Sequence, residues 1–370
     1  MEERLKGLHI THIDGDGVGC AIVGLLNTKY DYTTYCCNTG NANNNASNAL
    51  RKHITDKNWS SILISDVSID DDTADYVDKY CKDHNISLLM VDHHPTNKLS
   101  EKYDWVKMAE PVAGRPISAA AQLAFCLNDQ TKYRFGYIDV DSSGNRELFV
   151  SQTDNTSHSE PYPEYINYFN CDHNYNKPKF NVSYSVIISD ISRYDTWEWK
   201  KHPSNDGLED LTTILLRQYK KYTAANLAQH IINNIETCGC IFNEHDKELI
   251  NQYRNDVNKG HDENASRCKL IKFNGYRTIA FVSENMNISM FQEYVKERVH
   301  DEFDIIMGLE ASKRLISLRT PKDDIDLGAI AKLYNGGGHK QAAGASNIDP
   351  EAFCNILLDY YRGKDITWKE

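Results

Sequence analysis

The first 130 residues alternate between short apolar runs rich in β-branched residues and segments of helical length and pattern. Strands are predicted at 7–13, 30–37, 59–65 and 86–91, and helices at 18–28, 43–57, 69–84 and 117–128. Strands and helices that alternate at this spacing are typical of a parallel sheet with helices on both faces. The sequence therefore predicts an α/β fold built on a doubly wound, mostly parallel sheet.

The pattern breaks down after residue 130. Residues 131–180 are rich in Asn, Tyr, Ser and Asp and show little periodicity, so we expect a polar insertion with a hairpin around Ser142–Asn145. The run VSYSVIIS at 182–189 predicts that a strand then resumes the sheet.

The remainder of the chain predicts a second, smaller α/β domain. A helical pattern with few breakers covers 206–237. Further strands are predicted at 268–274, 277–283, 303–309 and 314–319, and helices at 288–300 and 325–335. We therefore expect a first domain over 1–200, a helical linker over 201–237 and a second domain over 238–370, with the active cleft between the two domains.

Composition excludes several classes of protein. The formal net charge of -12 disfavours a protein that coats nucleic acid or an anionic membrane. No run of 18 apolar residues is present, which argues against a membrane span. The ten cysteines form no paired CxxC modules, so free thiols in a reducing compartment are expected. The first residues lack the pattern of a signal peptide, and we expect a cytoplasmic protein.

Acidic and histidine residues follow four of the predicted strands. The clusters are His12-Ile-Asp14-Gly-Asp16, the isolated Asp66, Asp92-His93-His94, and Asp190. In an open parallel sheet the carboxyl ends of the strands line one edge, where ligands bind. If these strands are neighbours, the clusters meet in one crevice. Helix capping explains a single cluster of this kind but not four.

Carboxylates brought this close together need cations. Oxygen-rich ligands with a few imidazoles suit Mn²⁺ or Mg²⁺ better than structural Zn²⁺, which usually recruits thiolates. The number of ligands exceeds the need of one ion. The residues therefore predict a two-metal site of the kind that activates a bridging water for phosphoryl displacement.

In this order the motifs resemble those of the DHH phosphoesterases. Gly336-Gly337-Gly338-His339-Lys340-Gln-Ala-Ala-Gly344, preceded by Ser317-Leu318-Arg319, resembles the associated DHHA1 domain. The matching motifs span residues 12 to 344, nearly the whole chain. The combination of a DHH domain with a GGGH-type DHHA1 domain resembles the oligoribonuclease branch of this RecJ-like superfamily. That branch includes phosphatases of 3',5'-bisphosphorylated adenosine and hydrolases of cyclic or linear dinucleotides.

The resemblance implies a role for each residue of the first domain. The expected ligands of the first metal are His12, Asp14 and Asp66, and those of the second are Asp16, Asp66, His93 and Asp190. Asp66 would bridge the two ions. His94 would face the scissile phosphate or the leaving oxygen as an electrophile or acid, with Asp92 orienting an imidazole. Asp195 is the alternative to Asp190. We favour Asp190 because the end of a strand holds a ligand more rigidly than a loop does.

In the second domain the same resemblance points to a site for substrate. Gly336, Gly337 and Gly338 would let backbone N–H groups approach an anion, and His339 would bind a phosphate or a base. A simple turn is the alternative interpretation of the glycines. Arg319 and Lys340 are candidate phosphate partners, although either is also compatible with an ordinary surface charge.

Two weaker candidates complete the set. Arg115 precedes an apolar helix and is a further candidate for binding phosphate, but an ordinary surface arginine explains it better. Tyr194, Trp197 and Trp199 have the side chains needed to stack on a base, while packing between domain surfaces is the more common use of such aromatics.

The leading functional hypothesis is a two-metal phosphodiesterase that acts on short single-stranded oligonucleotides or small cyclic or linear nucleotides. In-line attack by a metal-bridging hydroxide is expected, with two Mn²⁺ ions as cofactors and Mg²⁺ as the alternative. A RecJ-like exonuclease for single-stranded DNA is the second hypothesis, and a non-catalytic nucleotide sensor is the third. No membrane partner is expected, and a homodimer is compatible with the sequence.

Overall fold

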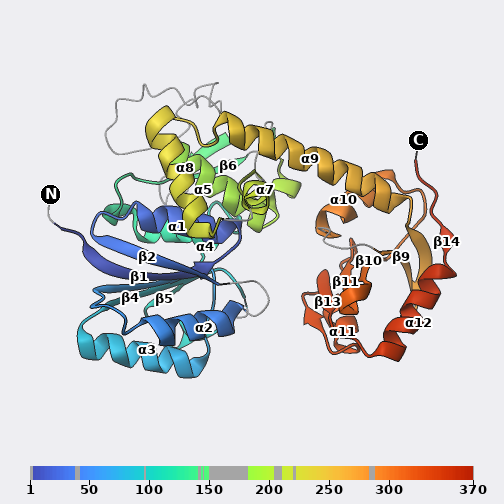
Figure 1. Ribbon diagram of the computed structural model, residues 1–370, viewed down its shortest axis with the longest axis horizontal. Coiled ribbons are helices and arrows are strands. Elements are labelled where there is room, and N and C mark those ends of the chain that lie inside the picture. The colour runs from blue at the N-terminus through green and yellow to red at the C-terminus, as the bar shows by residue number, and fades with distance from the viewer. Residues whose placement is uncertain are drawn as a thin grey trace. The chain divides into compact units, whose positions relative to one another are not determined.

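The structure is a computed structural model that forms two compact units, Met1–Asn251 and Gln252–Glu370 (Figure 1). It describes residues 3–37, 42–95, 97–140, 143–144, 146–149, 182–203, 211–219, 222–282 and 288–369. The boundary between the units falls within helix α9 (Glu244–Ala265). The first unit therefore extends beyond the linker expected at 201–237, and residues of that linker form helices of the first unit.

A parallel sheet of five strands organises the described part of the first unit. The strands are β1 (Leu5–His12), β2 (Tyr30–Cys37), β3 (Ser61–Ser65), β4 (Ser87–Asp92) and β5 (Val106–Met108). Their order is β2-β1-β3-β4-β5, and every neighbouring pair is parallel. The prediction of a parallel α/β sheet is confirmed. Because β2 and β3 lie on opposite sides of β1, the chain reverses its direction across the sheet between β1 and β3. Ligands of doubly wound sheets bind at such a point.

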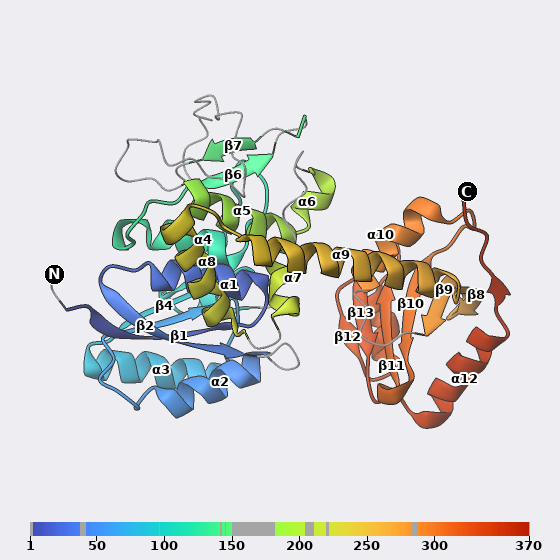
Figure 2. The ribbon, with the colours of Figure 1, turned by 45° about the horizontal axis from the view of Figure 1, so that its top comes forward.

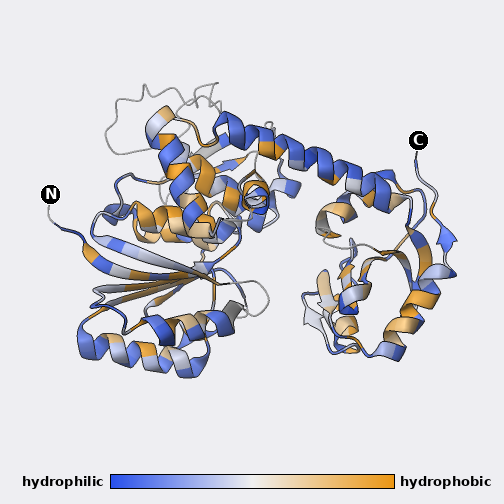
Figure 3. Ribbon diagram, viewed as in Figure 1, coloured by the Kyte–Doolittle hydropathy of each residue, from blue (hydrophilic) through white to orange (hydrophobic). Residues whose placement is uncertain are grey.

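Helices cover both faces of this sheet (Figures 1 and 2). One face carries α2 (Ala42–His53) and α3 (Asp71–His84), which bury an apolar cluster that includes Leu50, Ile64 and Val77. The other face carries α1, α4, α5 and α8, whose bounds are Gly15–Leu25, Ala119–Cys126, Val182–Asp195 and Ala224–Cys238. Helix α1 is buried through almost its whole length and contacts the other three. This explains why its sequence is apolar all round (Figure 3).

A buried polar stripe crosses the α1 face of the sheet. His9 on β1 bonds Ser65 on β3 through Nε2 at 2.7 Å, and Ser65 Oγ donates to Thr11 Oγ1 at 3.0 Å. All three side chains are fully buried. Burial lowers the pKa of His9 to about 3, so this imidazole is neutral in the folded protein. The stripe ends at the residue that precedes Asp66.

The prediction of a strand at 182–189 is wrong, because these residues form the first turns of α5. Ser185, Ser189 and Ser192 are four and three residues apart and therefore share one face of this helix. Their hydroxyls accept hydrogen bonds from the backbone N–H groups of Gly136, Ile138 and Ser118. The alternating polar and apolar residues thus serve a buried helix with a hydroxyl-bearing face.

Strands β6 (Tyr137–Val140) and β7 (Arg146–Phe149) form an antiparallel pair beside α5 (Figure 2). This confirms the hairpin predicted around Ser142–Asn145. Most of the predicted 131–180 insertion, from residue 150 onward, lies outside the described residues. The first unit also contains α6 (Glu198–Lys201) and α7 (Leu211–Gln218). Short 3₁₀ turns lie at Leu99–Glu101, Asn128–Gln130 and Ala311–Lys313.

The second unit is a mixed sheet with helices on both faces. Its strand order is β12-β13-β11-β10-β9-β8-β14, and only β9 and β10 pair in parallel among the strands described. The strands are β8 (Lys269–Phe273), β9 (Tyr276–Val282), β10 (Ile305–Glu310), β11 (Leu315–Arg319), β12 (Gly337–Gly338), β13 (Ala342–Ala345) and β14 (Lys364–Asp365). The helices are α10 (Ile288–Arg298), α11 (Leu327–Lys332) and α12 (Pro350–Tyr361). Two apolar clusters fill the unit, one of which includes residues of α10 and the other residues of α11 and α12.

Within the described residues no helix combines the length and the apolar character that crossing a bilayer requires.

Candidate metal-dependent active site

The ends of three neighbouring strands bring the predicted ligands together. His12 ends β1, Asp66 directly follows β3, and His93 directly follows β4. Because β1, β3 and β4 are adjacent and parallel, these side chains meet at the carboxyl edge of the sheet. The clusters that the sequence assigned to these three strand ends do form one site.

The turn after β1 fixes Asp14 at the start of α1. Asp14 Oδ1 accepts a hydrogen bond from Gly17 N at 3.1 Å and so caps the helix. Its other oxygen, Oδ2, lies 2.7 Å from His12 Nδ1. A Cβ atom at Gly17 would stand 2.1 Å from the His12 carbonyl oxygen. The glycine of this motif is therefore needed for the close approach of α1 to the end of β1.

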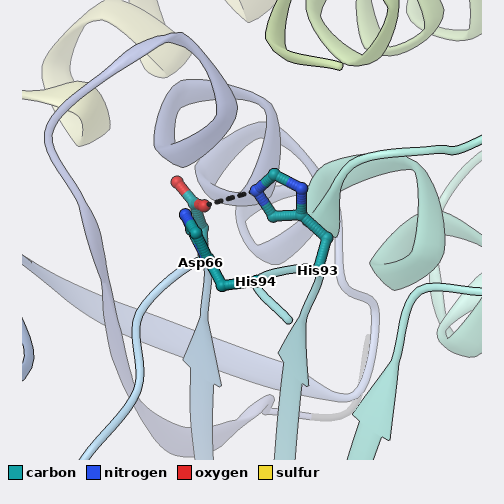
Figure 4. Close-up of side chains that lie close together, drawn as sticks. All are labelled: Asp66, His93 and His94. Atoms are coloured by element: carbon teal, nitrogen blue, oxygen red, sulfur yellow. Dashed lines mark ion pairs between the residues drawn. The ribbon is translucent and has the colours of Figure 1, made fainter. Parts of the chain in front are cut away.

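Asp66 faces two different imidazoles. Its Oδ2 atom lies 3.7 Å from His12 Nδ1, and its Oδ1 atom lies 3.5 Å from His93 Nε2. Figure 4 shows the Asp66 carboxylate beside the His93 ring, with His94 next to them. The backbone of Asp66 is left-handed, with φ at 55°, a conformation that costs free energy for a residue other than glycine. Strained backbone of this kind at a buried carboxylate is typical of a functional site.

Asp16 is held from the other side by the first turn of α4. Its oxygens accept hydrogen bonds from Ala119 N at 3.0 Å, from Ala120 N at 3.1 Å and from the Ser118 hydroxyl at 2.5 Å. The N-terminus of a helix favours a carboxylate electrostatically. The sequence did not reveal this support, although Ser118 at the start of an apolar helix is a typical N-cap pattern.

His93 lies close to the carboxylates of Asp16 and Asp195. His93 Nε2 lies 3.2 Å from Asp195 Oδ2 and 3.9 Å from Asp16 Oδ2. Three groups with the spacing of metal ligands result: His12, Asp14 and Asp66; Asp66, His93 and His94; and Asp16, His93 and Asp195. Within each group the potential ligand atoms all lie within 4.8 Å of one another.

Two buried atoms of this cluster, His12 Nε2 and Asp66 Oδ2, have no hydrogen-bond partner among the described residues. A buried polar atom without a partner is costly unless an ion or water satisfies it. The set of donors is mostly carboxylate oxygen with some imidazole nitrogen, which suits Mn²⁺ or Mg²⁺. The residues present therefore fit divalent cations.

The pKa values of the cluster also indicate that its carboxylates need compensating positive charge. Burial raises the pKa of Asp195 to about 7, and the charge of Asp16 adds to this effect. Burial also raises the pKa of Asp66 well above its usual value, with Asp14 and Asp16 contributing. For His12, burial favours the neutral ring, but Asp14 and Asp66 outweigh burial and raise the pKa to about 10. Without cations, protons compensate for the crowded carboxylates.

Asp92 orients His94 rather than the neighbouring His93. Asp92 Oδ1 lies 2.8 Å from His94 Nδ1 and accepts from the backbone N–H groups of both histidines. Its other oxygen accepts from Asn97 Nδ2 at 2.8 Å. The hydrogen bond that His94 donates to Asp92 raises the pKa of His94. The half-exposed His94 ring is thus held with one nitrogen on a buried carboxylate.

Asp190 and Asp195 occupy different surroundings on α5. The reason for preferring Asp190, its place at a strand end, does not apply because 182–189 is helical. Asp190 Oδ1 pairs with Arg146 Nη1 at 2.9 Å, and both side chains are buried. Asp195, at the end of α5, is the residue beside His93. Five residues on a helix turn through roughly 500°, so the two carboxylates point in different directions.

Arginines tie the β6–β7 hairpin to the rest of the unit. Besides the pair of Arg146 with Asp190, Asp139 on β6 accepts from Arg193 Nη1 at 3.1 Å and from Arg115 Nη1 at 2.7 Å. Arg193 and Asp139 are both buried. Arg115, a candidate for binding phosphate, is thus paired with a carboxylate, as a structural arginine would be.

The glycine motif of the second unit forms a tight antiparallel contact between β12 and β13. A Cβ atom at Gly336 would stand 2.2 Å from Gly344 O, and Gly338 has φ at 138°. The N–H groups of Gly336 and His339 bond Ala331 O and Ala342 O within the unit. The glycines at 336 and 338 are thus required by strand packing, which leaves the proposed anion contact as an additional role.

The predicted side chains around this motif lie on β11 and in the turn between β12 and β13, which are neighbouring parts of the second sheet. His339 and Lys340 are exposed, and Arg319 is half-buried on β11, where it pairs with Ala342 of β13. Burial lowers the pKa of Arg319, and its Nη1 atom donates to Leu318 O at 2.8 Å.

The chain is similar to several known proteins. No protein-family model matches the sequence. Oligoribonuclease NrnB of Bacillus subtilis is 22% identical over 344 residues, which cover 92% of this chain and 72% of the relative. Among solved structures, the pGpG-specific phosphodiesterase PggH of Vibrio cholerae is 13% identical, with a TM-score of 0.49 and coverage of 95% of this chain and 99% of that one. RecJ of Thermus thermophilus in complex with Mn²⁺ is 13% identical, with a TM-score of 0.44 and coverage of 99% and 53%.

The motifs occur in a fixed order along the chain, and the parallel sheet brings those of the first unit to one edge. This arrangement, and the 22% identity to oligoribonuclease NrnB over 92% of the sequence, agree with the resemblance to the DHH phosphoesterases that the motifs indicate.

Proposed function

We propose that this chain is a phosphodiesterase that uses two divalent cations to hydrolyse short oligonucleotides or small cyclic or linear nucleotides. One observation carries the proposal: the carboxylate of Asp66 presents one oxygen toward His12 and the other toward His93. A buried carboxylate shared between two sets of ligands is the arrangement expected for a pair of metal ions.

The first ion would be held by His12, Asp14 and Asp66. The second would be held by Asp66 together with Asp16, His93 and Asp195, in place of the set that contained Asp190. Mn²⁺ is the ion we propose, with Mg²⁺ as the alternative. When bound, such a pair of cations supplies a water of lowered pKa and neutralises charge that develops on the phosphoryl oxygens.

The chain supplies the remaining chemistry. His94, fixed through Nδ1 by Asp92, would donate a proton or a hydrogen bond from its other nitrogen to the leaving oxygen. A raised pKa keeps a larger fraction of this ring protonated near neutral pH. Asp16 and Asp14 are anchored by helix N-termini, so the ligand set is oriented before substrate binds.

In the second unit, Arg319, His339, Lys340 and the glycines at 336–338 would bind the phosphate or base of the substrate. Exposed cationic side chains beside a glycine-rich strand suit an anionic ligand. A formal charge of -12 disfavours long polyanions, whose binding depends on many phosphate contacts. The name of the relative, an oligoribonuclease, supports the choice of a short RNA substrate.

The test is a cleavage assay in Mn²⁺ with a ladder of substrates: a dinucleotide, a pentamer and a long single strand, each as RNA and as DNA. We expect the shortest RNAs to disappear fastest and EDTA to abolish cleavage. D66A and H93A should be inactive, whereas D83N, which changes an exposed acidic residue of α3, should match the wild type. Retained turnover in D66A would contradict the metal assignment.

The same assay separates the alternatives. Progressive loss of the long DNA with little loss of dinucleotide would indicate a RecJ-like exonuclease. Tight binding of nucleotide without turnover in either metal would indicate a sensor.

A further inference from the structure

Trp197 lies in the turn between α5 and α6, two residues beyond Asp195. Its backbone is left-handed, with φ at 60°, and its side chain is 40% exposed. A bulky residue is a genuine outlier in this conformation, and an exposed indole gains little from burial. Residues held in this way cluster where a protein binds its ligand.

Two more rings support this indole from behind. The rings of Trp197 and Trp199 are nearly parallel, with 7° between their planes and 6.1 Å between their centroids. Trp199 in turn packs against Tyr194 at 5.3 Å, and Lys200 Nζ lies 4.5 Å from the centre of the Trp199 ring. Trp199 and Tyr194 are only partly exposed, so the outermost ring of the stack is Trp197.

The turn that carries the stack is held by hydrogen bonds. Trp197 N donates to Tyr194 O at 3.2 Å, and Lys200 N donates to Trp197 O at 3.1 Å. The buried Arg193 donates to the carbonyl oxygen of His202 across the turn. The backbone that carries the indole is therefore held in place, and the ring rests against Trp199, which reduces the entropy cost of stacking.

We propose that Trp197, backed by Trp199, is a stacking platform for one nucleobase of the substrate. The proposal rests on the proposed function, because the phosphate joined to that base would lie at the Asp16–His93–Asp195 group. The Cα atoms of Asp195 and Trp197 can be no more than about 7 Å apart along the chain, which is within the reach of a single nucleotide. Stacking uses the π face that every base possesses, so the subsite accepts all four bases.

The test compares W197A and W197F with the wild type on two kinds of dinucleotide, one with both bases and one with either base removed. We expect W197A to raise KM for the intact dinucleotide by about 10- to 100-fold, with a smaller change in kcat. W197F should stay within about threefold of the wild type, because it retains an aromatic face. Removal of the stacked base should make W197A and the wild type equivalent.

Y361A serves as the matched control, since Tyr361 is an aromatic residue of α12 that is 73% exposed. It should leave KM unchanged. An unchanged KM in W197A would overturn the proposal. An equal rise in KM for the substrates that lack a base would also overturn it. The indole would then support the structure of the site and would not contact a base.

A binding measurement separates this proposal from the proposed function. Adenosine 5'-monophosphate is titrated in the presence of Ca²⁺ while tryptophan fluorescence is recorded. Quenching in the wild type and Y361A, but not in W197A, supports the platform even if no substrate is cleaved. Equal quenching in W197A overturns it even if the enzyme is active.

Discussion

Arg146 Nη1 on β7 lies 2.9 Å from Asp190 Oδ1 on α5, and both side chains are buried. This ion pair gives Asp190 a partner of opposite charge within the unit. Asp195, one helical turn and a residue further along, has His93 as its neighbour instead. The two aspartates of one helix are therefore expected to respond differently to substitution.

We expect D195N to lower kcat/KM by at least about 100-fold and to weaken Mn²⁺ binding, because it removes a charged ligand. D190N should keep activity within about tenfold but destabilise the protein by about 1–3 kcal/mol, since it removes the buried carboxylate that pairs with Arg146. Assays of activity, together with unfolding in urea, measure both effects. The reverse pattern, with D190N inactive at normal stability, would restore Asp190 as the ligand.

Metal stoichiometry tests the shared role of Asp66. D66A should lose both ions, because both proposed sets of ligands include this carboxylate, which faces His12 with one oxygen and His93 with the other. D195N should instead weaken one site and leave the other near its normal affinity. Isothermal titration with Mn²⁺ distinguishes the two cases. If D66A still bound one ion with wild-type affinity, Asp66 would not be shared.

The binding of cations should depend strongly on pH. The pKa of Asp195 is raised to about 7 by burial and by Asp16, so below that pH a proton must leave before an ion binds. The affinity for Mn²⁺ is therefore expected to rise between pH 5.5 and 8, by up to about tenfold per unit for each proton released. Titrations in buffers of different ionisation enthalpy count the protons. An affinity independent of pH would show that the carboxylates are already ionised.

Asp92 should set the alkaline limb of the rate profile. The hydrogen bond that His94 donates to Asp92 raises the pKa of His94, and a protonated acid is lost as the pH rises through its pKa. In D92N the pKa of His94 falls toward its ordinary value, so activity should decline at a lower pH than in the wild type. The pH dependence of kcat/KM for a dinucleotide measures this shift. N97A, which removes the contact on the other oxygen of Asp92, should shift the limb less.

His9 makes the first unit sensitive to acid. Its pKa is about 3 in the folded state and about 6.5 when unfolded, so the unfolded chain binds the extra proton between these values. Stability from the neutral ring is complete above pH 6.5 and falls as the pH drops, by up to about 1.4 kcal/mol per unit. H9Q should show a shallower decline between pH 6.5 and 5 than the wild type does. Urea unfolding at several pH values gives the slopes, and equal slopes would show that His9 is not the group responsible.

Much of the first unit could be predicted because its signals are local. Strands buried on both faces read as apolar runs, as in Ile62–Ile64, and the acidic residues that follow them mark the edge of the sheet. The expected elements from β1 to β4, and the helices between them, are confirmed within a few residues. The convergence of His12, Asp66 and His93 follows from the parallel topology alone.

The errors arise where a tertiary contact changes the meaning of a pattern. The segment 182–189 has the composition of a strand, and its helical nature appears only in the i, i+4 and i+7 spacing of the serines that bond β6 and α4. The sequence pattern does not predict helix α9, because most of its residues are polar and it has no clear apolar stripe (Figure 3). Helix α12 was missed although Asp349 followed by Pro350 is a typical N-terminus. The small residues of β13 carry no strand signal: a Cβ atom at Gly344 would stand 2.8 Å from Ile316 O on β11, so close strand packing requires glycine there.

All of the candidate metal ligands precede residue 196 and belong to one compact unit, whereas the glycine motif belongs to the other. A substitution near His339 leaves every supporting contact of the ligands in place. With the roles proposed above, substrate range can therefore diverge among descendants of such a chain while the chemistry of hydrolysis is inherited unchanged. The metal ligands cannot vary in the same gradual way. Asp66 has a strained backbone and faces two histidines, so a substitution there disturbs several ligands at once.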